Sequence, residues 1–337
     1  LRSQRKYMKI GIVFAGQGAQ YSGMGKDLYE RYPGAAEIFD MAGQQVKDWC
    51  FEGDEETLKQ THVTQPTIYT TTMAAYRALM DKLAEEGLAD KLEITALAGF
   101  SLGEYSALTA AGAIDEISKG IDIVSKRGAL MQQAGLDEEG NAKGGMAAGM
   151  GDRAAVLEAV EEAREDGILE GVNFNSPVQT VVAGDKAALK RFRRAAKERK
   201  VKAIPLGVST AFHSPMMVPA AEKLRDVLKA AELKAPHTKV YANTTADDIM
   251  KGAEGKNSAE HLTEVLAKQA MSPVYWEEII KRFEADRVEM IIVVGPRKTL
   301  TGFTKKTCPD IMALNVENSE TLDAAVTAIS EKLQQSL

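Results

Sequence analysis

Cysteine is scarce in this chain of 337 residues, which contains only Cys50 and Cys308. A disulfide framework and a cysteine-rich metal site are therefore both excluded. Apolar runs of the length that crosses a bilayer, about 20 residues, are also missing, so we expect no membrane span. Positive charge is in deficit: the net charge is −6, which argues against a nucleic-acid partner. The remaining composition, 45% hydrophobic and 27% charged, is typical of a globular protein with a sizeable core.

The beginning of the chain lacks the marks of a secretory signal. Residues 1–7 are basic, but the apolar segment after them is short and leads directly into a loop rich in glutamine and glycine. A signal sequence would need a longer apolar region followed by a cleavage site of small residues. We therefore expect a cytoplasmic protein.

Residues 94–112 (ITALAGFSLGEYSALTAAG) contain the pattern G-x-S-x-G with Ser101 at its centre. The first half of the segment is typical of a short buried strand, and the second half is typical of a helix. A strand that turns directly into a helix holds the corner residue in a strained conformation and exposes it. Gly99 and Gly103 would let the two elements approach each other closely.

A serine at such a corner suits nucleophilic catalysis. Its hydroxyl projects from the turn, while the unpaired N–H groups at the start of the helix point toward the oxyanion that forms. The alternative is an ordinary serine in a turn between a strand and a helix, and the pattern alone leaves both open.

A second glycine-rich loop follows a strand expected over residues 9–15. It begins Gly16-Gln17-Gly18, but Tyr21 stands where a dinucleotide-binding fingerprint needs its third glycine. The sequence thus predicts no nucleotide site of that type. The backbone N–H groups of this loop still lie at the carboxyl edge of a sheet, where α/β proteins keep their sites.

Helices are expected over residues 26–32, 35–46, 65–86 and 115–135, and the last of these contains an anomaly. Its apolar residues fill one arc of the helix, and Arg127 lies in the middle of that arc. A buried guanidinium needs an anionic partner, because an unpaired buried charge is costly. Two interpretations remain: a structural salt bridge to a core acid, or an arginine that receives a carboxylate ligand.

The segment after this helix has a different order of elements. Strands and helices alternate as βαββαβ over residues 144–149, 152–165, 168–174, 178–183, 185–200 and 202–208. This is the ferredoxin-like order. The predicted fold class is therefore α/β, with a larger, α/β-hydrolase-like domain whose sheet is mostly parallel (residues 1–137 and 208–337). The ferredoxin-like domain (residues 138–207) is inserted into it.

The base for Ser101 must come from four histidines, His62, His213, His237 and His261. Only His213 follows an expected strand, and the other three lie in or beside polar segments, so we expect His213 to be the base. Asp185 fits the chain order of an α/β-hydrolase triad but falls in the inserted domain. An amide or a backbone carbonyl is therefore expected to orient the imidazole instead.

Several motifs occur in the order found in malonyl-CoA:acyl carrier protein transacylases, which the chain resembles from Met8 onward. They are residues 14–20 (FAGQGAQ), 99–108 (GFSLGEYSAL), 126–128 (KRG), 173–177 (NFNSP), 211–216 (AFHSPM) and 295–296 (GP). Because these motifs are separate and in register, the resemblance is far more specific than one G-x-S-x-G pattern. It includes the inserted ferredoxin-like segment.

The resemblance implies a role for each matching residue. Ser101 would be the nucleophile, His213 its base, and Gln269 the residue whose carbonyl orients that histidine. The backbone N–H groups of Gln17 and Leu102 would form the oxyanion hole. Finally, Arg127 would bind the free carboxylate of the malonyl group through two hydrogen bonds.

The resemblance also implies the reaction and its partners. The enzyme would transfer malonyl from malonyl-CoA to the phosphopantetheine thiol of acyl carrier protein, by a ping-pong mechanism through a malonyl ester of Ser101. This is a step of fatty-acid synthesis, carried out by a monomer without metal or cofactor. Two other functions are weighed against it: a serine esterase or thioesterase on a related fold, and a non-catalytic domain that binds acyl thioesters.

Three positions depart from the family pattern. Ala15 stands where the family often has proline, and Phe100 precedes the nucleophile where histidine is common. Arg297 replaces the usual glycine after the Gly-Pro pair, which puts the backbone shape of that loop in question.

The expected helix 185–200 carries most of its charge as lysine and arginine, on a chain that is acidic as a whole. Lys190, Arg191 and Arg194 belong to this basic cluster. Because carrier proteins of this type are acidic, the cluster could attract the carrier. The alternative is a helix face that is simply solvated.

Overall fold

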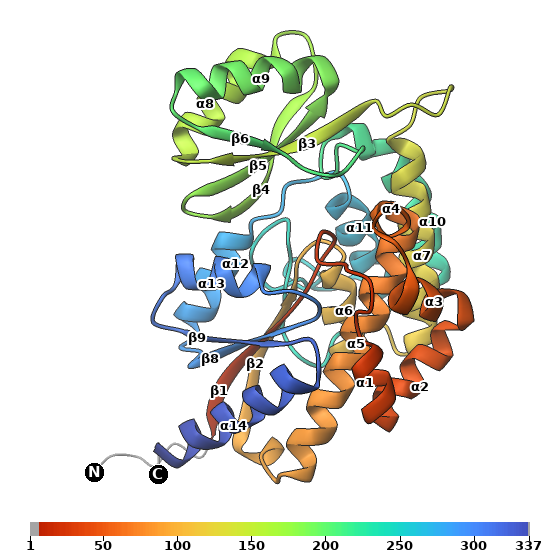
Figure 1. Cartoon of the computed structure of the whole chain (residues 1–337), viewed down its shortest axis with the longest axis vertical. Helices are drawn as coiled ribbons and strands as arrows, with labels where there is room; N and C mark the ends of the chain where they lie inside the picture. The colour runs from red at the N-terminus through yellow and green to blue at the C-terminus, as the bar shows by residue number, and fades with distance from the viewer. Residues whose placement is uncertain (1–6, 336–337) are drawn as a thin grey trace.

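The structure, a computed structural model, describes residues 7–335, so the basic segment at the beginning of the chain lies almost entirely outside the described residues. Two sheets organise these residues, one above the other in Figure 1. The lower and larger part holds a parallel sheet surrounded by helices, and the upper and smaller part holds an antiparallel sheet. The expected α/β fold class with a second, smaller ferredoxin-like unit is confirmed.

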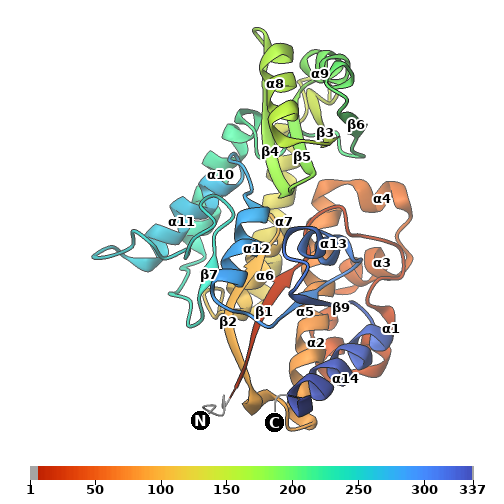
Figure 2. The same ribbon diagram turned by 90° about the vertical axis from the view of Figure 1, so that its left-hand side faces the viewer.

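The larger sheet has five strands in the order β7-β2-β1-β8-β9, and all of its paired neighbours are parallel. The strands are β1 (Met8–Phe14), β2 (Leu92–Gly99), β7 (Val240–Tyr241), β8 (Met290–Val294) and β9 (Met312–Val316). Parallel pairing brings their carboxyl ends to one edge of the sheet. In Figure 2 the arrow of β1 points toward the small sheet, so this edge faces the upper part of the molecule.

Strand β1 is apolar along nearly its whole length because both faces of the sheet are covered. Ile12 and Phe14 belong to the core that contains α5 (Thr61–Glu85), whereas Val13 belongs to the core on the opposite face, with α12 (Trp276–Ala285). A continuous apolar run of this kind indicates a central strand.

Helices surround the larger sheet. Besides α5 and α12 they are α1 (Lys26–Arg31), α2 (Pro33–Ala42), α3 (Gln44–Glu52), α4 (Glu55–Lys59), α6 (Gly103–Ala110), α7 (Ile117–Ala134), α10 (Val218–Ala230), α11 (Ser258–Gln269), α13 (Thr299–Thr307) and α14 (Ser319–Gln335). The expected single helix over residues 35–46 is wrong, because Gly43 has φ 86° and separates α2 from α3. The expected start of α5 at residue 65 is also wrong: the helix begins at Thr61 and carries Pro66 inside it.

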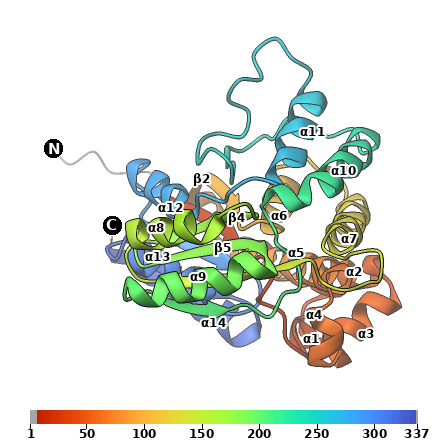
Figure 3. The ribbon, with the colours of Figure 1, turned by 90° about the horizontal axis from the view of Figure 1, so that it is seen from above.

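The small sheet has the strand order β4-β5-β3-β6, and its paired neighbours are antiparallel. Its elements are β3 (Gly144–Met150), α8 (Arg153–Arg164), β4 (Leu169–Ser176), β5 (Gln179–Asp185), α9 (Lys186–Glu198) and β6 (Lys202–Pro205). Along β3, Ala147 packs with α8 and α9, while Met146 and Ala148 join the core of the larger part. Figure 3 shows α8 and α9 side by side over this sheet.

The two parts are joined close to the carboxyl edge of the large sheet. The N–H of Phe174 in β4 donates to the carbonyl of Val274 at 2.9 Å, and the N–H of Val274 donates to the carbonyl of Val172 at 2.8 Å. Arg153 at the start of α8 forms an ion pair with Glu277 in α12. These contacts hold the small sheet over the edge where the strands of the large sheet end.

A membrane span is not among the elements of residues 7–335. No helix there has both the length and the apolar character that crossing a bilayer requires.

Candidate active site

Ser101 lies at the corner between β2 and α6, in a left-handed conformation with φ 52°. The two flanking glycines have no room for a side chain. A Cβ on Gly99 would lie 1.8 Å from the backbone of Gly103, and a Cβ on Gly103 would lie 2.3 Å from the carbonyl oxygen of Phe14. The close approach that the G-x-S-x-G pattern predicted is therefore present, and it requires glycine at both positions.

His213 lies against this corner. Its Nε2 is 2.8 Å from Ser101 Oγ, and its Nδ1 is 2.9 Å from the backbone carbonyl oxygen of Gln269. A carbonyl can only accept, so Nδ1 carries the proton and donates it, which leaves Nε2 free to accept from the serine hydroxyl. A backbone carbonyl therefore occupies the position behind the histidine that a carboxylate takes in hydrolases.

The segment that carries His213 differs from the expected one, in which the histidine directly follows a strand. Strand β6 ends at Pro205, short of the expected residue 208, and belongs to the small sheet. His213 therefore does not stand at the edge of the same sheet as Ser101, but on a loop that returns to the larger part with φ 61° at the histidine itself. Asp185 lies away from this site, where it accepts from the N–H of Ala188 as the N-cap of α9.

His213 is buried, with 3% of the residue exposed. Burial, together with the positive charge of Arg127, lowers the pKa of His213 from its ordinary value of 6.5 to about 4. Burial disfavours the charged form, and a nearby cation does the same. The histidine is consequently neutral at physiological pH, which is the state that a base requires.

Arg127 is 1% exposed, and the acceptors of its hydrogen bonds are neutral. Its Nη1 donates to Gln65 Oε1 at 2.8 Å, and its Nη2 donates to Gln269 Oε1 at 3.0 Å and to Ser101 Oγ at 3.3 Å. The ring of Tyr105 lies beneath the guanidinium, with its centroid 5.2 Å from Cζ. Within residues 7–335 no carboxylate forms an ion pair with it, so the structural salt bridge that the sequence left open is absent.

Two buried polar residues at this site escaped the sequence analysis. Asn243 Oδ1 accepts the N–H of Ser101 at 2.7 Å, and its Nδ2 donates to the carbonyl of Gly99 at 2.7 Å. Glu104 Oε1 in turn accepts the N–H of Asn243 at 2.7 Å, and burial raises the pKa of this carboxyl to about 7. Asn243 follows β7 closely, at the same sheet edge as Ser101, and that position is the signal that could have revealed it.

The two expected oxyanion donors, the N–H groups of Leu102 and Gln17, belong to different elements. The N–H of Leu102 is at the N-cap of α6, while Gln17 lies in the loop after β1 and lines the same cavity as Ser101. Neither N–H donates a hydrogen bond to another residue in the described part of the chain. Both donors are thus available to a ligand.

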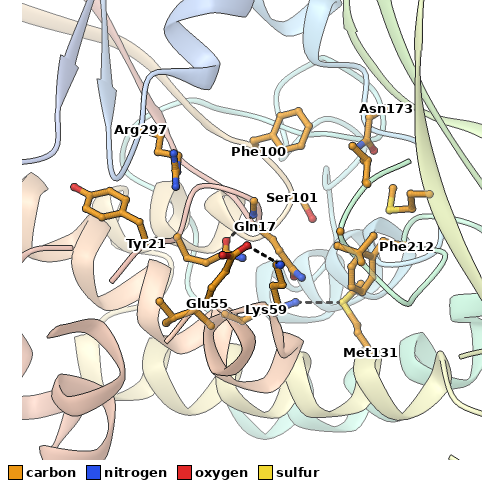
Figure 4. Close-up of a pocket in the computed structure, with 18 of the residues that line it drawn as sticks. Gln17, Tyr21, Glu55, Lys59, Phe100, Ser101, Met131, Asn173, Phe212 and Arg297 are labelled. Carbon is orange, nitrogen blue, oxygen red and sulfur yellow. Dashed lines mark hydrogen bonds and ion pairs between the residues drawn. The ribbon is translucent and has the colours of Figure 1, made fainter. Parts of the chain in front are cut away.

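A cavity of about 550 Å³ opens over Ser101 and His213, between the two parts of the molecule. Met146, Asn173 and the loop 206–208 line it from the upper side. Figure 4 shows Ser101 between two groups of wall residues, with Arg297 and Tyr21 on one side and Phe212 and Met131 on the other. Arg127 is not itself on the wall but is hydrogen-bonded to two residues that are, Ser101 and Gln65.

Comparison with known proteins shows the family of the chain. The acyl transferase domain family matches residues 12–326. A malonyl CoA-acyl carrier protein transacylase from Bacillus subtilis is 38% identical over 331 residues, which covers 96% of this chain and 98% of the relative. The chain belongs to this transacylase family. It is accordingly an acyltransferase.

Solved structures of transacylases share the whole architecture. The malonyl CoA-acyl carrier protein transacylase from Clostridium perfringens superimposes with a TM-score of 0.85 at 35% identity, covering 96% of this chain and 98% of that one. A malonyl-transacylase solved in complex with a type II PKS acyl-carrier protein has a TM-score of 0.85 at 33% identity, with 95% and 99% covered. The inserted small sheet is therefore part of the shared fold.

The three departures from the transacylase pattern now have a structural setting. Phe100 packs edge-on against Trp276, with ring centroids 5.3 Å apart. Ala15 packs closely against Gly295, since a Cβ added to Gly295 would lie 2.6 Å from the Cβ of Ala15. Arg297 has φ 63°, so the loop keeps a left-handed conformation even though its usual glycine is replaced.

The expected carrier-binding cations occupy α9, on the outer side of the small sheet (Figure 1). Arg191 is engaged within the protein, since it donates to the carbonyls of Ala163 at 2.8 Å and Arg164 at 3.0 Å. The side chain of Arg194 is 87% exposed and lies 3.6 Å from Glu198. Lys190 lines a shallow hollow together with other cations of α9.

A metal site was not expected from the sequence. Among residues 7–335, no group of three or more His, Cys, Asp or Glu side chains is arranged to hold an ion.

Proposed function

We propose that the protein transfers the malonyl group of malonyl-CoA to the phosphopantetheine thiol of acyl carrier protein, through a malonyl ester of Ser101. The observation that carries the proposal is the 2.8 Å contact between Ser101 Oγ and the neutral Nε2 of His213, beside the buried guanidinium of Arg127. The names of the relatives, malonyl CoA-acyl carrier protein transacylases, support the substrate pair.

In the first half of the cycle, Ser101 Oγ attacks the thioester carbon while His213 Nε2 takes the hydroxyl proton. The carbonyl oxygen becomes an oxyanion, to which the N–H groups of Gln17 and Leu102 donate. Losing one such donor typically lowers a rate by about 10²–10³. The C–S bond then breaks, His213 returns its proton to the sulfur, and coenzyme A leaves as the free thiol.

Arg127 supplies the selectivity for a malonyl group. The second carboxylate of the substrate is an anion, and it would replace neutral acceptors such as Gln65 Oε1 and Ser101 Oγ around the guanidinium. A bidentate pair between a guanidinium and a carboxylate is stronger than hydrogen bonds to neutral oxygens. An acyl group without the carboxylate would leave the buried charge of Arg127 without an anion.

The second half of the cycle repeats the chemistry with another thiol. The thiol of the phosphopantetheine arm gives its proton to His213 and attacks the ester carbon, through the same oxyanion site. The bond between carbon and Ser101 Oγ then breaks, and the proton passes from His213 to the serine. The product is a malonyl thioester on the carrier, and the enzyme is regenerated.

The enzyme acts without a metal or cofactor in this proposal, and as a monomer. The carrier is attracted by the exposed cations of α9, among them Lys190 and Arg194, although Arg194 is also paired with Glu198, while Arg191 is held by backbone carbonyls. An acidic partner and a basic helix face attract each other over distances beyond direct contact.

Mass spectrometry after mixing with malonyl-CoA tests the function. We expect one malonyl adduct on Ser101 that a thiol acceptor removes, and none on the matched variant Ser101→Ala. Rapid release of free malonate without transfer would identify a serine hydrolase instead. Tight binding without any adduct would identify a non-catalytic domain that binds acyl thioesters, and either result would reject the proposal.

A further inference from the structure

Arg297 lines the same cavity as Ser101 and His213 but has no part in the transfer chemistry. It follows β8 in the loop that begins at Gly295, and its own φ is 63°. A residue with a side chain adopts this conformation at a cost in free energy that glycine avoids. Backbone strain beside an active site is a reason to ask what the side chain contributes.

The surroundings of Arg297 fix its position but leave its charge unpaired. Its backbone N–H donates to Glu317 Oε2 at 2.7 Å, and the hydroxyl of Tyr21 donates to the same oxygen at 3.0 Å. The guanidinium carbon lies 5.4 Å from the centre of the Tyr21 ring, so the ring supports it from one face. No carboxylate in residues 7–335 forms an ion pair with this guanidinium.

The other cation on the cavity wall differs in this respect. Lys59 Nζ is paired with Glu55 Oε1 at 2.7 Å, and both side chains belong to α4. Their charges cancel, whereas the guanidinium of Arg297 forms no ion pair with any of residues 7–335. Ser101 lies between the two groups of wall residues in Figure 4 and is less exposed than Arg297.

We propose that Arg297 binds the phosphate at the end of the pantetheine arm, the group that coenzyme A and a carrier-linked arm have in common. The inference rests on the proposed function, because it takes the thioester at Ser101 as one end of the arm. A guanidinium presents two parallel N–H donors that match two phosphate oxygens. The arm between thioester and phosphate is uncharged, and apart from Arg297 the residues that line the cavity are uncharged or, like Lys59 and Glu55, paired with each other. The site thereby selects phosphorylated thioesters over unphosphorylated ones.

Equilibrium binding to the full chain tests this assignment without turnover. We would measure dissociation constants for coenzyme A, 4′-phosphopantetheine and pantetheine by calorimetry, with the wild type and with Arg297→Gly. Glycine suits φ 63°, so the variant should fold at least as stably as the wild type. We expect the dissociation constants of the two phosphorylated ligands to rise about tenfold, and that of pantetheine to stay within about twofold.

Two further variants separate charge from shape. Arg297→Lys keeps the positive charge but lacks the two parallel N–H donors of a guanidinium. It should therefore bind the phosphorylated ligands more tightly than Arg297→Gly but less tightly than the wild type. Lys305→Ala removes one exposed positive charge elsewhere on the neighbouring helix α13 and should change none of the three constants.

Several results would overturn the assignment. Equal weakening of all three ligands would mean that Arg297 shapes the loop, and unchanged binding of 4′-phosphopantetheine would mean that its phosphate lies elsewhere. A loss confined to coenzyme A would place the contact on the nucleotide phosphates. Because binding needs no acyl transfer, a failure to form the Ser101 adduct would reject the proposed function while this test still gave its own answer.

Discussion

Ser101 Oγ lies within hydrogen-bonding distance of two groups of opposite character, the neutral imidazole of His213 and the charged guanidinium of Arg127. The two effects support each other. The cation favours the ionised serine oxygen, and it also lowers the pKa of His213, which keeps the base unprotonated. The backbone carbonyl of Gln269 orients the imidazole without adding the negative charge that would raise its pKa again. At the scale of single residues, a neutral backbone carbonyl therefore takes the place of a carboxylate behind His213, and a cation lies beside the nucleophile.

The pH dependence of acylation follows from this arrangement. A base must be unprotonated to act, and the pKa of His213 is about 4, so the rate should be constant from about pH 8 to 5 and fall below about pH 4. Single-turnover acylation of Ser101 by malonyl-CoA measures it. In Arg127→Met the cation is absent, so the pKa of His213 should rise and the acylation rate should begin to fall at a higher pH. A wild-type rate that falls with an apparent pKa near 6.5 would contradict the prediction.

Arg127 also sets the preference among acyl groups. In Arg127→Ala the ratio of kcat/KM for malonyl-CoA to that for acetyl-CoA should drop by at least about 30-fold, equivalent to about 2 kcal/mol, because the carboxylate loses its partner. The ratio cancels any general loss of folded enzyme. Arg127→Lys keeps the positive charge but lacks the two parallel N–H donors, so its ratio should lie between those of the wild type and Arg127→Ala. An unchanged ratio would make Arg127 a purely structural residue.

At the scale of elements, the site depends on how tightly β2 and α6 approach each other. Two side chains from elsewhere hold the turn: Asn243 bridges the N–H of Ser101 and the carbonyl of Gly99, and Gln269 Nε2 donates to the carbonyl of Ser101 at 2.8 Å. Asn243 is itself held by Glu104, which is buried in the first turn of α6 and accepts the N–H of Asn243. The strained φ of the nucleophile is thus maintained by hydrogen bonds from two other segments.

Substitution of Gly99 tests this packing. In Gly99→Ala the new methyl group would overlap the backbone of Gly103, so we expect the free energy of unfolding to fall by about 3 kcal/mol or more. Gly302→Ala is the matched control, since its Cβ would meet nothing within 4 Å in the interior of α13. It should gain about 0.5–1 kcal/mol from helix propensity. Denaturant unfolding of both variants checks the pair, and equal stabilities would contradict the argument.

At the scale of the whole molecule, the small sheet forms one wall of the cavity. Its inner face joins the main core, and its outer face carries α8 and α9. The basic residues of α9 consequently lie away from Ser101, on the outside, while the charge of the chain as a whole is −6. Such a separation of charge suits attraction of an acidic carrier before its arm enters the cavity.

Charge reversal on α9 tests the docking. The double variant Lys190→Glu/Arg194→Glu leaves Arg191 in place, because its bonds to backbone carbonyls stabilise the small domain. At low salt we expect the KM for carrier to rise several-fold, acylation by malonyl-CoA to stay unchanged, and the effect to shrink at high salt. Lys223→Glu/Lys229→Glu on α10 is the control with the same change in net charge. An unaffected KM for carrier would exclude docking at α9.

Much of the site could be predicted because its signals are local. The elbow follows from glycines two residues to either side of Ser101, and the anomaly of Arg127 follows from its place in an apolar arc. The βαββαβ order likewise predicted the small sheet. Asn243 could not be found in this way, because its partners are about 140 residues away in the chain and β7 has only two residues. The break at Gly43 was missed because the apolar pattern of α2 continues into α3.

By itself the sequence determined the strained corner, the buried cation and the alternation of elements, since each depends on spacing along the chain. Only the tertiary structure decided which groups meet. It placed His213 against Ser101 through a loop that leaves the small sheet, set a backbone carbonyl behind the histidine, and surrounded Arg127 with neutral oxygens. The physical reason is that hydrogen bonds and charge interactions act over a few ångströms, whereas the residues that make them around Ser101 are separated by up to 168 positions in the chain.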